Sequence, residues 1–410
     1  MNGLSLNLLY IDPGTGSILF SIFIGATATL YFVFRALIIK LKVVLSGGKA
    51  GSTDKASYKY VIYNEGNQYC NVFKPVLDEF ETRGIELFYF TSVRNDPVFK
   101  ENYRFVKSEF IGEGNKAFAR LNLLSAEKVL MTTPGLDVYQ LKRSRNVKHY
   151  SHVIHMVSDA TTYRLFGLDY FDSVLLSGDY QKEDLRELEK QRKLPAKELV
   201  TVGCSYLDIY KQRLKDLPPE KDHPFTVLIS PSWGTSALLS RFGFRLLDPL
   251  SETGWRIIVR PHPQSKKSES RILDALEERY KAKVNILWDY ERENIYSLSK
   301  ADIMISDFSG IIFDYTFLFN RPVMYVRQGM DLRPYDADDI NHELWQFKEL
   351  AEFGIELKEE YFSSIKEIIQ NIKGNPILDK ARLKAKETAW QYPGEAGKRI
   401  TDFLTGINNA

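Results

Sequence analysis

Trp255-Arg-Ile-Ile-Val-Arg-Pro-His-Pro263 and Asp302-Ile-Met-Ile-Ser-Asp-Phe-Ser-Gly310 each join a short apolar run to polar and small residues. Such runs, rich in β-branched residues and bounded by proline or glycine, are typical of buried strands that end in a turn or a helix. In an open α/β sheet, ligands bind just beyond the ends of such strands. The two stretches therefore predict an α/β fold with a binding site at the carboxyl edge of a parallel sheet.

The same alternation continues on both sides of these stretches. The first series of predicted strands is 60–63, 85–90, 128–132, 152–155, 173–176 and 199–202, and the second is 225–230, 255–260, 284–287, 302–305 and 322–326. Segments with helical spacing or composition, such as 72–83 and 182–192, lie between them. Strands that alternate with helices form βαβ units. We therefore expect two Rossmann-like, doubly wound domains.

Leu217-Pro-Pro-Glu-Lys-Asp-His-Pro224 interrupts the alternation with prolines and charges, which are typical of a domain boundary. A chain of 410 residues is also too long for one ordinary core. We predict an N-terminal, acceptor-binding domain at 58–216 and a C-terminal, nucleotide-donor domain at 225–410. Residues 46–57 include a run of glycine and serine and are predicted to be a linker.

Residues 1–45 are predicted to form a membrane anchor with a basic flank. No residue between 13 and 34 is charged. The apolar runs of this segment suit one transmembrane helix of about 20 residues at 14–34. A buried core helix is the alternative. The cations that follow the span are Arg35, Lys40, Lys42, Lys49 and Lys55. By the positive-inside rule they predict a single-pass protein of the inner cell membrane with cytoplasmic catalytic domains.

The composition excludes several classes of protein. A formal net charge of +2 does not indicate a nucleic-acid binder. Cys70 and Cys204 are the two cysteines, and they suggest neither a disulfide framework nor a metal site. Neither G-x-G-x-x-G nor G-x-x-x-x-G-K-[ST] follows a predicted strand. The sequence therefore lacks the main evidence for a dinucleotide-dependent dehydrogenase or for a P-loop protein. Nothing requires a metal or another cofactor, and Asp336-Ala-Asp338-Asp339 is expected to be a solvated loop.

The strand ends of the second series offer groups for a diphosphate whose leaving group needs a proton. Arg260 can hold phosphate oxygens bidentately, although an arginine at a strand end is also often an ion-pair partner. His262, between Pro261 and Pro263, could donate a proton to a departing phosphate, or could be structural. Ser309 and Gly310 open a helix whose free N–H groups can bind phosphate.

Two further positions complete this predicted donor site. Ser232, Trp233 and Gly234 lie on the first strand-to-helix loop of the domain, where Trp233 could stack on a base or simply cover the edge of the core. Asp314, one turn into the helix after Gly310, could hold the hydroxyls of a ribose or glycerol moiety. Its alternative role is a solvated carboxylate near a helix start.

Ser230-Pro-Ser-Trp-Gly234, Arg260-Pro-His262 and Ser306-Asp-Phe-Ser-Gly-Ile-Ile-Phe-Asp314 resemble, in order and spacing, the donor-site motifs of the CDP-glycerol glycerophosphotransferase family. These enzymes add glycerol phosphate in teichoic acid synthesis. The resemblance covers the second predicted domain and implies the two-domain GT-B architecture. It also implies that CDP-glycerol is bound by Ser232, Trp233, Gly234, Arg260, Pro261, His262, Ser309, Gly310 and Asp314.

The first domain resembles the family less closely. Where the family has His-Gly-x-Pro at a strand end, this chain has His155-Met-Val-Ser158. The resemblance makes His155 the candidate base for the acceptor hydroxyl and His262 the second catalytic residue. Asp159 could orient His155, by analogy with other base-orienting carboxylates. Thr132-Thr-Pro-Gly135, at another strand end, could shape the acceptor pocket or could form a turn.

The function implied is a membrane-anchored glycerophosphotransferase that moves glycerol phosphate from CDP-glycerol to a lipid-linked or glycan acceptor in surface polymer synthesis. Its expected partners are CDP-glycerol, a membrane-embedded lipid-linked acceptor and the membrane, without nucleic acid and without a cofactor. Two alternatives remain: a GT-B glycosyltransferase that uses a nucleotide sugar, and a catalytically idle membrane scaffold.

Overall fold

Two parallel sheets carry the fold of the computed structural model, which describes residues 27, 29–31, 34, 57–218, 223–291, 293–327 and 330–407. The predicted span at 14–34, its basic flank and the linker lie outside the described residues, apart from isolated positions. In the part of the chain that the structure describes, no helix combines the length and the apolar character needed to cross a membrane. Residues 57–410 form one unit.

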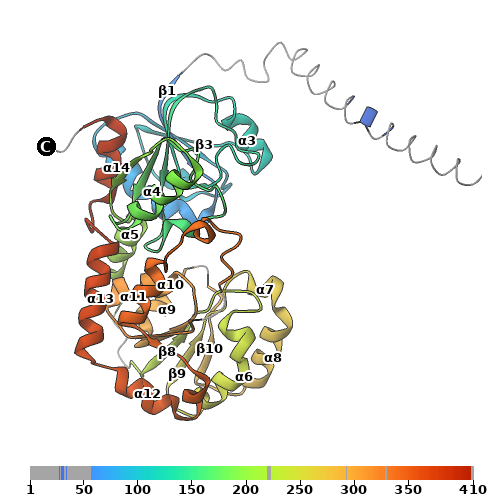
Figure 1. The fold of residues 1–410 in the computed structure, drawn as a ribbon, viewed down its shortest axis with the longest axis vertical. Helices are drawn as coiled ribbons and strands as arrows, with labels where there is room; N and C mark the ends of the chain where they lie inside the picture. The colour runs from blue at the N-terminus through green and yellow to red at the C-terminus, as the bar shows by residue number, and fades with distance from the viewer. Residues whose placement is uncertain are drawn as a thin grey trace, which may run out of the picture. The chain divides into compact units, whose positions relative to one another are not determined.

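The first sheet has seven strands in the order β3-β2-β1-β4-β5-β6-β7, all parallel (Figure 1). The strands are β1 (Tyr58–Asn64), β2 (Leu87–Thr91), β3 (Val106–Phe110), β4 (Ser125–Met131), β5 (Asn146–Val153), β6 (Ser173–Leu176) and β7 (Glu198–Thr201). The helices between them are α2 (Cys70–Thr82), α3 (Asn115–Leu121) and α4 (Gln181–Arg192), and α5 (Ser205–Leu214) follows β7.

The second sheet has six parallel strands in the order β10-β9-β8-β11-β12-β13. They are β8 (Thr226–Ile229), β9 (Arg256–Val259), β10 (Ile286–Trp288), β11 (Ile303–Ser306), β12 (Val323–Tyr325) and β13 (Ile355–Glu356). The helices of this half are α6 (Leu238–Ser251), α7 (Ser265–Ser268), α8 (Ser270–Tyr280), α9 (Ile295–Lys300), α10 (Ile311–Phe319), α11 (Trp345–Phe353), α12 (Ile365–Ile372), α13 (Pro376–Ala389) and α14 (Ala396–Thr405). The prediction of two Rossmann-like domains is confirmed.

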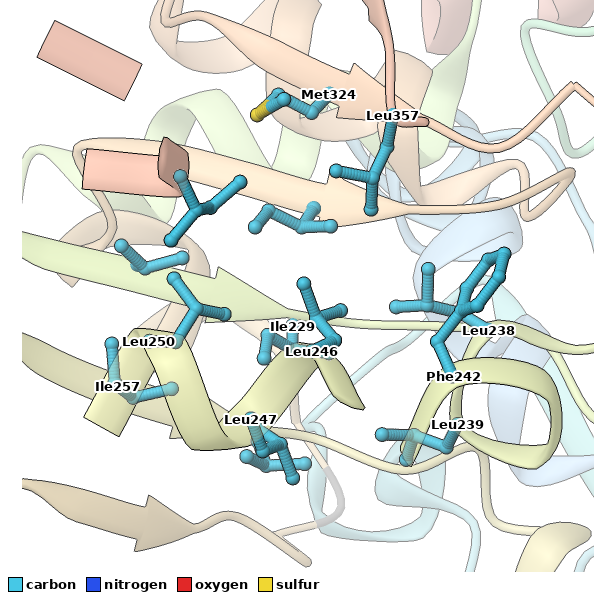
Figure 2. Close-up of a cluster of buried hydrophobic side chains, with 14 of the residues drawn as sticks. Ile229, Leu238, Leu239, Phe242, Leu246, Leu247, Leu250, Ile257, Met324 and Leu357 are labelled. Atoms are coloured by element: carbon cyan, nitrogen blue, oxygen red, sulfur yellow. The ribbon is translucent and has the colours of Figure 1, made fainter. Parts of the chain in front are cut away.

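Strands β8, β11 and β12 of the second sheet are buried on both faces, which is why the sequence shows continuous apolar runs there rather than alternation. Val227 and Ile229 of β8 face α6 and α8, whereas Leu228 between them faces the layer of α10 and α13. Figure 2 shows Leu246 and Leu250 of α6 against Ile229 and Ile257 in the first of these layers.

The C-terminal segment departs from the predicted boundary of the second domain at 225–410. Ile400 and Leu404 of α14 lie in the same buried cluster as Phe73 of α2, in the core of the first sheet. Asp208 of α5 accepts hydrogen bonds from the N–H groups of Gly394 and Ala396 just before this helix. The chain therefore crosses to the second sheet and returns to the first.

The loop Asp336-Ala-Asp338-Asp339 is solvated only in part: Asp338 is exposed as predicted, but Asp336 is buried. Asp336 is 1% exposed and accepts a hydrogen bond from Arg192 at the end of α4, at 2.7 Å. Its carboxylate also accepts hydrogen bonds from the N–H groups of Phe166 and Gly167. The prediction failed for Asp336 because its cation, Arg192, belongs to the first half of the chain and not to the local sequence.

Candidate active site

Both sheets reverse their strand order once, and the predicted site residues follow the strands at these points. In the second sheet β8 lies beside β11, while the chain runs from β8 to β9 on one side and from β11 to β12 on the other. The loop of Ser232 follows β8 and the loop of Ser309 follows β11. Ligands bind outside the carboxyl ends of strands at such reversals, so this edge is the candidate donor site.

The loop after β8 is fixed from two sides. The buried Asp307 accepts hydrogen bonds from the N–H groups of Ser232 and Leu238, both at 2.9 Å. Glu269 accepts one from the N–H of Gly234, also at 2.9 Å, where φ is +103° and favours glycine. The N–H groups of Ser232 and Gly234 are thus already used. Trp233, 49% exposed, remains as the side chain that can contact a ligand here.

His262 is held with its proton on one defined nitrogen. The N–H of Gln264 donates to Nδ1 of His262 at 3.1 Å, so in the neutral ring the proton lies on Nε2. Burial lowers the pKa of His262, against an opposing effect of Glu269 and Asp307. The ring centroid lies 6.3 Å from that of Trp233. At neutral pH, His262 can therefore donate a hydrogen bond from Nε2 toward a ligand beside Trp233.

Arg260 differs from its predicted role as a phosphate clamp. Its guanidinium donates to Asp289 Oδ2 and to the carbonyl oxygen of Glu291, both at 2.6 Å, and its side chain is 12% exposed. The charge of Arg260 is therefore balanced within the protein. The structure supports the ion-pair alternative. In this role Arg260 fixes the backbone at the buried Pro261, and so it also fixes the position of His262.

The helix after Ser309 begins without a side-chain cap. Gly310 caps α10 without a side-chain hydrogen bond, but the N–H groups of Ile312 and Phe313 donate to the carbonyl oxygens of Ser309 and Gly310, so it is chiefly the positive end of the helix dipole that can attract an anion here. A Cβ on Gly310 would lie 4.0 Å from Oγ of Ser158, which belongs to the loop after β5. The donor-side loop and the loop of the first sheet that carries His155 therefore meet.

Asp314, predicted to hold ligand hydroxyls, contacts the hydroxyl of Tyr206 on α5. Burial raises the pKa of Asp314 to about 7, and this hydrogen bond acts in the opposite direction. A carboxyl group with this pKa is partly protonated at neutral pH, so it can both donate and accept hydrogen bonds. Its partner is nevertheless protein rather than open solvent.

His155 lies just beyond β5, and two hydroxyl groups surround its Nδ1. Oγ1 of Thr132 lies 2.7 Å from Nδ1, and the hydroxyl of Tyr163 lies 2.9 Å from it. The ring of Tyr69 packs against the imidazole at 4.8 Å between centroids. Burial lowers the pKa of His155 to about 4, so the ring is neutral at pH 7.

These contacts determine which nitrogen of His155 carries the proton. Thr132 donates its hydroxyl hydrogen to the carbonyl oxygen of Val153 at 2.9 Å, so toward His155 it can only accept. Nδ1 of His155 must therefore be the donor. Tyr163 also accepts from it and can give its own hydrogen to Nε2 of His152, 3.2 Å away. Nε2 of His155 is left with its lone pair, and no described residue hydrogen-bonds to it.

Asp159 does not orient His155, contrary to the prediction. Its carboxylate accepts hydrogen bonds from the N–H groups of Trp345 and Gln346, at 3.0 and 2.8 Å, and so caps α11. Burial raises the pKa of Asp159 to about 7. Thr132 and Tyr163 perform the orienting role instead. Thr132 could be found from its place at a strand end, whereas no local pattern pointed to Tyr163.

The comparisons with known proteins concern the family resemblance and the fold. Residues 201–399 match the family described as CDP-Glycerol:Poly(glycerophosphate) glycerophosphotransferase. None of the curated proteins matches the chain. The resemblance predicted from the donor-side motifs is confirmed by this match.

Three solved structures illustrate the shared fold. A structure of the wall teichoic acid polymerase TagF is 12% identical with a TM-score of 0.59, and the match covers 91% of this chain and 97% of that one. A TagF structure soaked with CDPG is 13% identical, with a TM-score of 0.56 and coverage of 91% and 96%. UDP-GlcNAc 2-epimerase from Neisseria meningitidis, bound to UDP-GlcNAc, is 14% identical, with a TM-score of 0.57 and coverage of 85% and 100%. At these identities the likeness establishes the fold alone.

Proposed function

We propose that this chain, whose residues 201–399 match the CDP-glycerol:poly(glycerophosphate) glycerophosphotransferase family, transfers glycerol phosphate from CDP-glycerol to a hydroxyl group of an acceptor. The observation that carries the proposal is the pair of histidines in opposite tautomers. His155 offers a lone pair at Nε2, and His262 offers a proton at Nε2. A base on one loop and a hydrogen-bond donor on the other suit transfer to an acceptor hydroxyl with a phosphate as the leaving group.

The reaction would proceed in one displacement. Nε2 of His155 takes the proton of the acceptor hydroxyl as its oxygen bonds to the β-phosphorus of CDP-glycerol. The bond from that phosphorus to the bridging oxygen breaks, and CMP leaves with the bonding electrons. His262 donates a hydrogen bond or a proton to the departing phosphate. The N-terminus of α10, with Ser309 and Gly310, would face the negative charge of the diphosphate.

The setting of the reaction extends the proposal. Residues 14–34 would anchor the chain in the cell membrane, with the catalytic domains on the cytoplasmic side. The acceptor would then be lipid-linked and lie in the adjacent leaflet, as part of teichoic-acid-like or surface polymer synthesis. Membrane fractionation of the full-length chain and of a chain lacking residues 1–45 tests the anchor, because only the former should sediment with membranes.

The donor can be identified by the nucleotide that is released. We expect full-length protein with membrane acceptor to release CMP from CDP-glycerol and to release no UDP or UMP from UDP-sugars. UDP release in place of CMP would support a nucleotide-sugar glycosyltransferase and overturn the proposal. Release of neither nucleotide from any donor would leave the idle scaffold as the remaining class.

A further inference from the structure

One segment of the second half reaches the loop that carries Tyr163. Residues 334–336, which follow β12, pair with residues 163–165 through a short antiparallel bridge. The N–H of Asp336 donates to the carbonyl oxygen of Tyr163 at 2.9 Å. Because the hydroxyl of Tyr163 lies 2.9 Å from Nδ1 of His155, we propose that Asp336 is a positioning residue for His155. The inference rests on the function proposed above and adds that the donor-side half holds the base in place.

The carboxylate of Asp336 bonds to the same loop a few residues further on. Its Oδ1 accepts a hydrogen bond from the N–H of Phe166 at 2.7 Å, and its Oδ2 accepts one from the N–H of Gly167 at 3.2 Å. Asp336 is 1% exposed, and hydrogen bonds to an ionised carboxylate are stronger than those between neutral groups. The main chain and the side chain of this one residue therefore fix the loop at Tyr163, Phe166 and Gly167.

The loop of Tyr163 depends on contacts from outside. Apart from the bridge, residues 163–172, all of which the structure describes, form neither a helix nor a strand. Phe166 has a φ of +65°, which is unfavourable for a residue with a Cβ. A Cβ on Gly167 would lie 2.8 Å from the carbonyl oxygen of Arg164, so the turn is also tight. Such a backbone conformation persists only where surrounding contacts hold it, and Asp336 supplies them here.

The position of Tyr163 matters because its hydroxyl is one of two acceptors for the Nδ1–H of His155. The other acceptor is Thr132, in the loop after β4. With both in place, the proton stays on Nδ1 and the lone pair stays on Nε2, toward the acceptor hydroxyl. A displaced Tyr163 would leave the imidazole with one partner and more freedom to rotate. A smaller fraction of bound acceptor would then have the geometry for proton transfer.

These contacts differ from those that merely join the two halves. Arg192 pairs with Asp336 and also with Asp339 of the same segment, at 2.7 and 2.6 Å. In the part of the chain that the structure describes, the carboxylate of Asp339 bonds to Arg192 and not to the loop of Tyr163. Asp339 thus shares the cation of Asp336 but lacks its contacts to the loop, which makes it a matched control.

Steady-state kinetics of CMP release, with full-length protein and membrane acceptor, compare Asp336→Ala with Asp339→Ala. Each variant loses a contact to Arg192, but only Asp336→Ala releases the loop. We expect its kcat to fall about tenfold with an unchanged KM for CDP-glycerol, because the donor is bound by other loops. The kcat of Asp339→Ala should stay within about twofold of the wild type. Equal kcat values in the two folded variants would overturn the proposal, because packing alone would then hold the ring of Tyr163.

A double-mutant cycle shows whether Asp336 acts through Tyr163. Tyr163→Phe keeps the ring and removes the hydroxyl beside Nδ1, so Asp336→Ala should have no further effect on kcat in that background. Effects that multiply in the double variant would contradict the positioning role.

Asp336→Asn serves if Asp336→Ala does not fold. It keeps the shape of the side chain and Oδ1, the acceptor for Phe166, but loses the acceptor for Gly167. We expect its kcat to fall about threefold, and this loss to disappear in the Tyr163→Phe background. An unchanged kcat, or a loss that persists in that background, would overturn the proposal.

NMR of full-length protein labelled with [¹⁵N]histidine observes the His155 ring without turnover. We expect the Nδ1–H resonance of His155 to be the same in the wild type and Asp339→Ala, and to shift or broaden in Asp336→Ala and Tyr163→Phe. This pattern in a protein that releases no CMP would overturn the transfer reaction and support the positioning role. CMP release by the wild type, with the same resonance in Asp336→Ala as in Asp339→Ala, would overturn the positioning role alone.

Discussion

His155 and His262 follow strands of different sheets and are held in opposite tautomers by neutral groups. Thr132 and Tyr163 accept from Nδ1 of His155, whereas a backbone N–H donates to Nδ1 of His262. Neither arrangement uses a carboxylate to orient the ring. Because burial is not offset by an adjacent negative charge, the pKa of His155 falls to about 4.

The pH dependence of turnover follows from this low pKa. Protonation of Nε2 removes the base, so kcat should stay nearly constant from pH 8 down to about pH 5 and fall as the pH approaches 4. The same shift affects stability: the folded pKa lies below the ordinary value of 6.5, so the stability that neutral His155 contributes is present above pH 6.5 and is lost as the pH falls toward 4. A fall in kcat centred near pH 6.5 would contradict the assignment.

Thr132 should act as a positioning residue. Thr132→Val removes the acceptor for Nδ1–H and leaves Tyr163 as its remaining partner, so kcat is expected to fall by about 10²-fold with an unchanged KM for CDP-glycerol. Thr132→Ser should restore turnover because it restores the hydroxyl. Thr161→Val is the control, since Oγ1 of Thr161 is buried and has no hydrogen-bond partner among the described residues. Steady-state kinetics on all three variants would show whether the hydroxyl matters.

Helices α6 and α11 each begin at a carboxylate from a different part of the chain. Asp307, after β11, accepts from the N–H of Leu238 at the start of α6, and Asp159, after β5, accepts from Trp345 at the start of α11. An acidic residue at a helix N-terminus stabilises the helix. Here each carboxylate also fixes the position of a loop beside the candidate active site. Helix α10, between them in sequence, has no such side-chain cap, and its first turn is closed by backbone hydrogen bonds to Ser309 and Gly310.

Asp307→Ala tests this use of a buried carboxylate. The variant loses hydrogen bonds to the N–H groups of Ser232 and Leu238, so we expect a loss of about 2 kcal/mol in the free energy of unfolding. The loop of Trp233 should also become less ordered, which would raise the Kd for CDP-glycerol. Urea denaturation and calorimetric titration measure the two effects. Asp331→Ala is the control, because Asp331 is exposed and pairs with the exposed Arg333.

The two halves of residues 57–410 are joined by buried charges as well as by α14. Arg192 of α4 contacts Asp169 of its own half and Asp336 and Asp339 of the other, at 2.6 to 2.8 Å. Around this cluster, Leu188 packs with Ile340 and Leu344. The segment that follows β12 is thereby fixed to the first half, close to the loop of Asp159.

Arg192→Met should destabilise the protein strongly. It keeps most of the side-chain volume but leaves Asp169 and Asp336 as buried carboxylates without their cation, which costs about 3–5 kcal/mol. Arg333→Met, which breaks an exposed pair, should cost less than about 1 kcal/mol. Chemical denaturation monitored by tryptophan fluorescence compares the two. Similar midpoints for both variants would show that the cluster does not hold the halves together.

Local sequence patterns predicted the strands and helices better than the side-chain contacts between them. Apolar runs such as 173–176 predicted strands because a strand buried on both faces needs apolar residues throughout, whereas the short β13 carries too few residues for a pattern. The predicted histidines both lie at strand ends of the candidate site. The pairing of Arg260 with Asp289, the burial of Asp336 and the role of Tyr163 depend on contacts between distant parts of the chain, which no local spacing records.

Transfer of label from CDP-[¹⁴C]glycerol to membrane acceptor, in the wild type and in His155→Ala, tests whether this chain is a glycerophosphotransferase with His155 as its base. We expect the wild type to label the acceptor and to release CMP in equal amount. His155→Ala should bind CDP-glycerol as the wild type does while its kcat falls by about 10²- to 10⁴-fold. A wild type that releases no CMP, or a folded His155→Ala variant with wild-type turnover, would contradict that assignment.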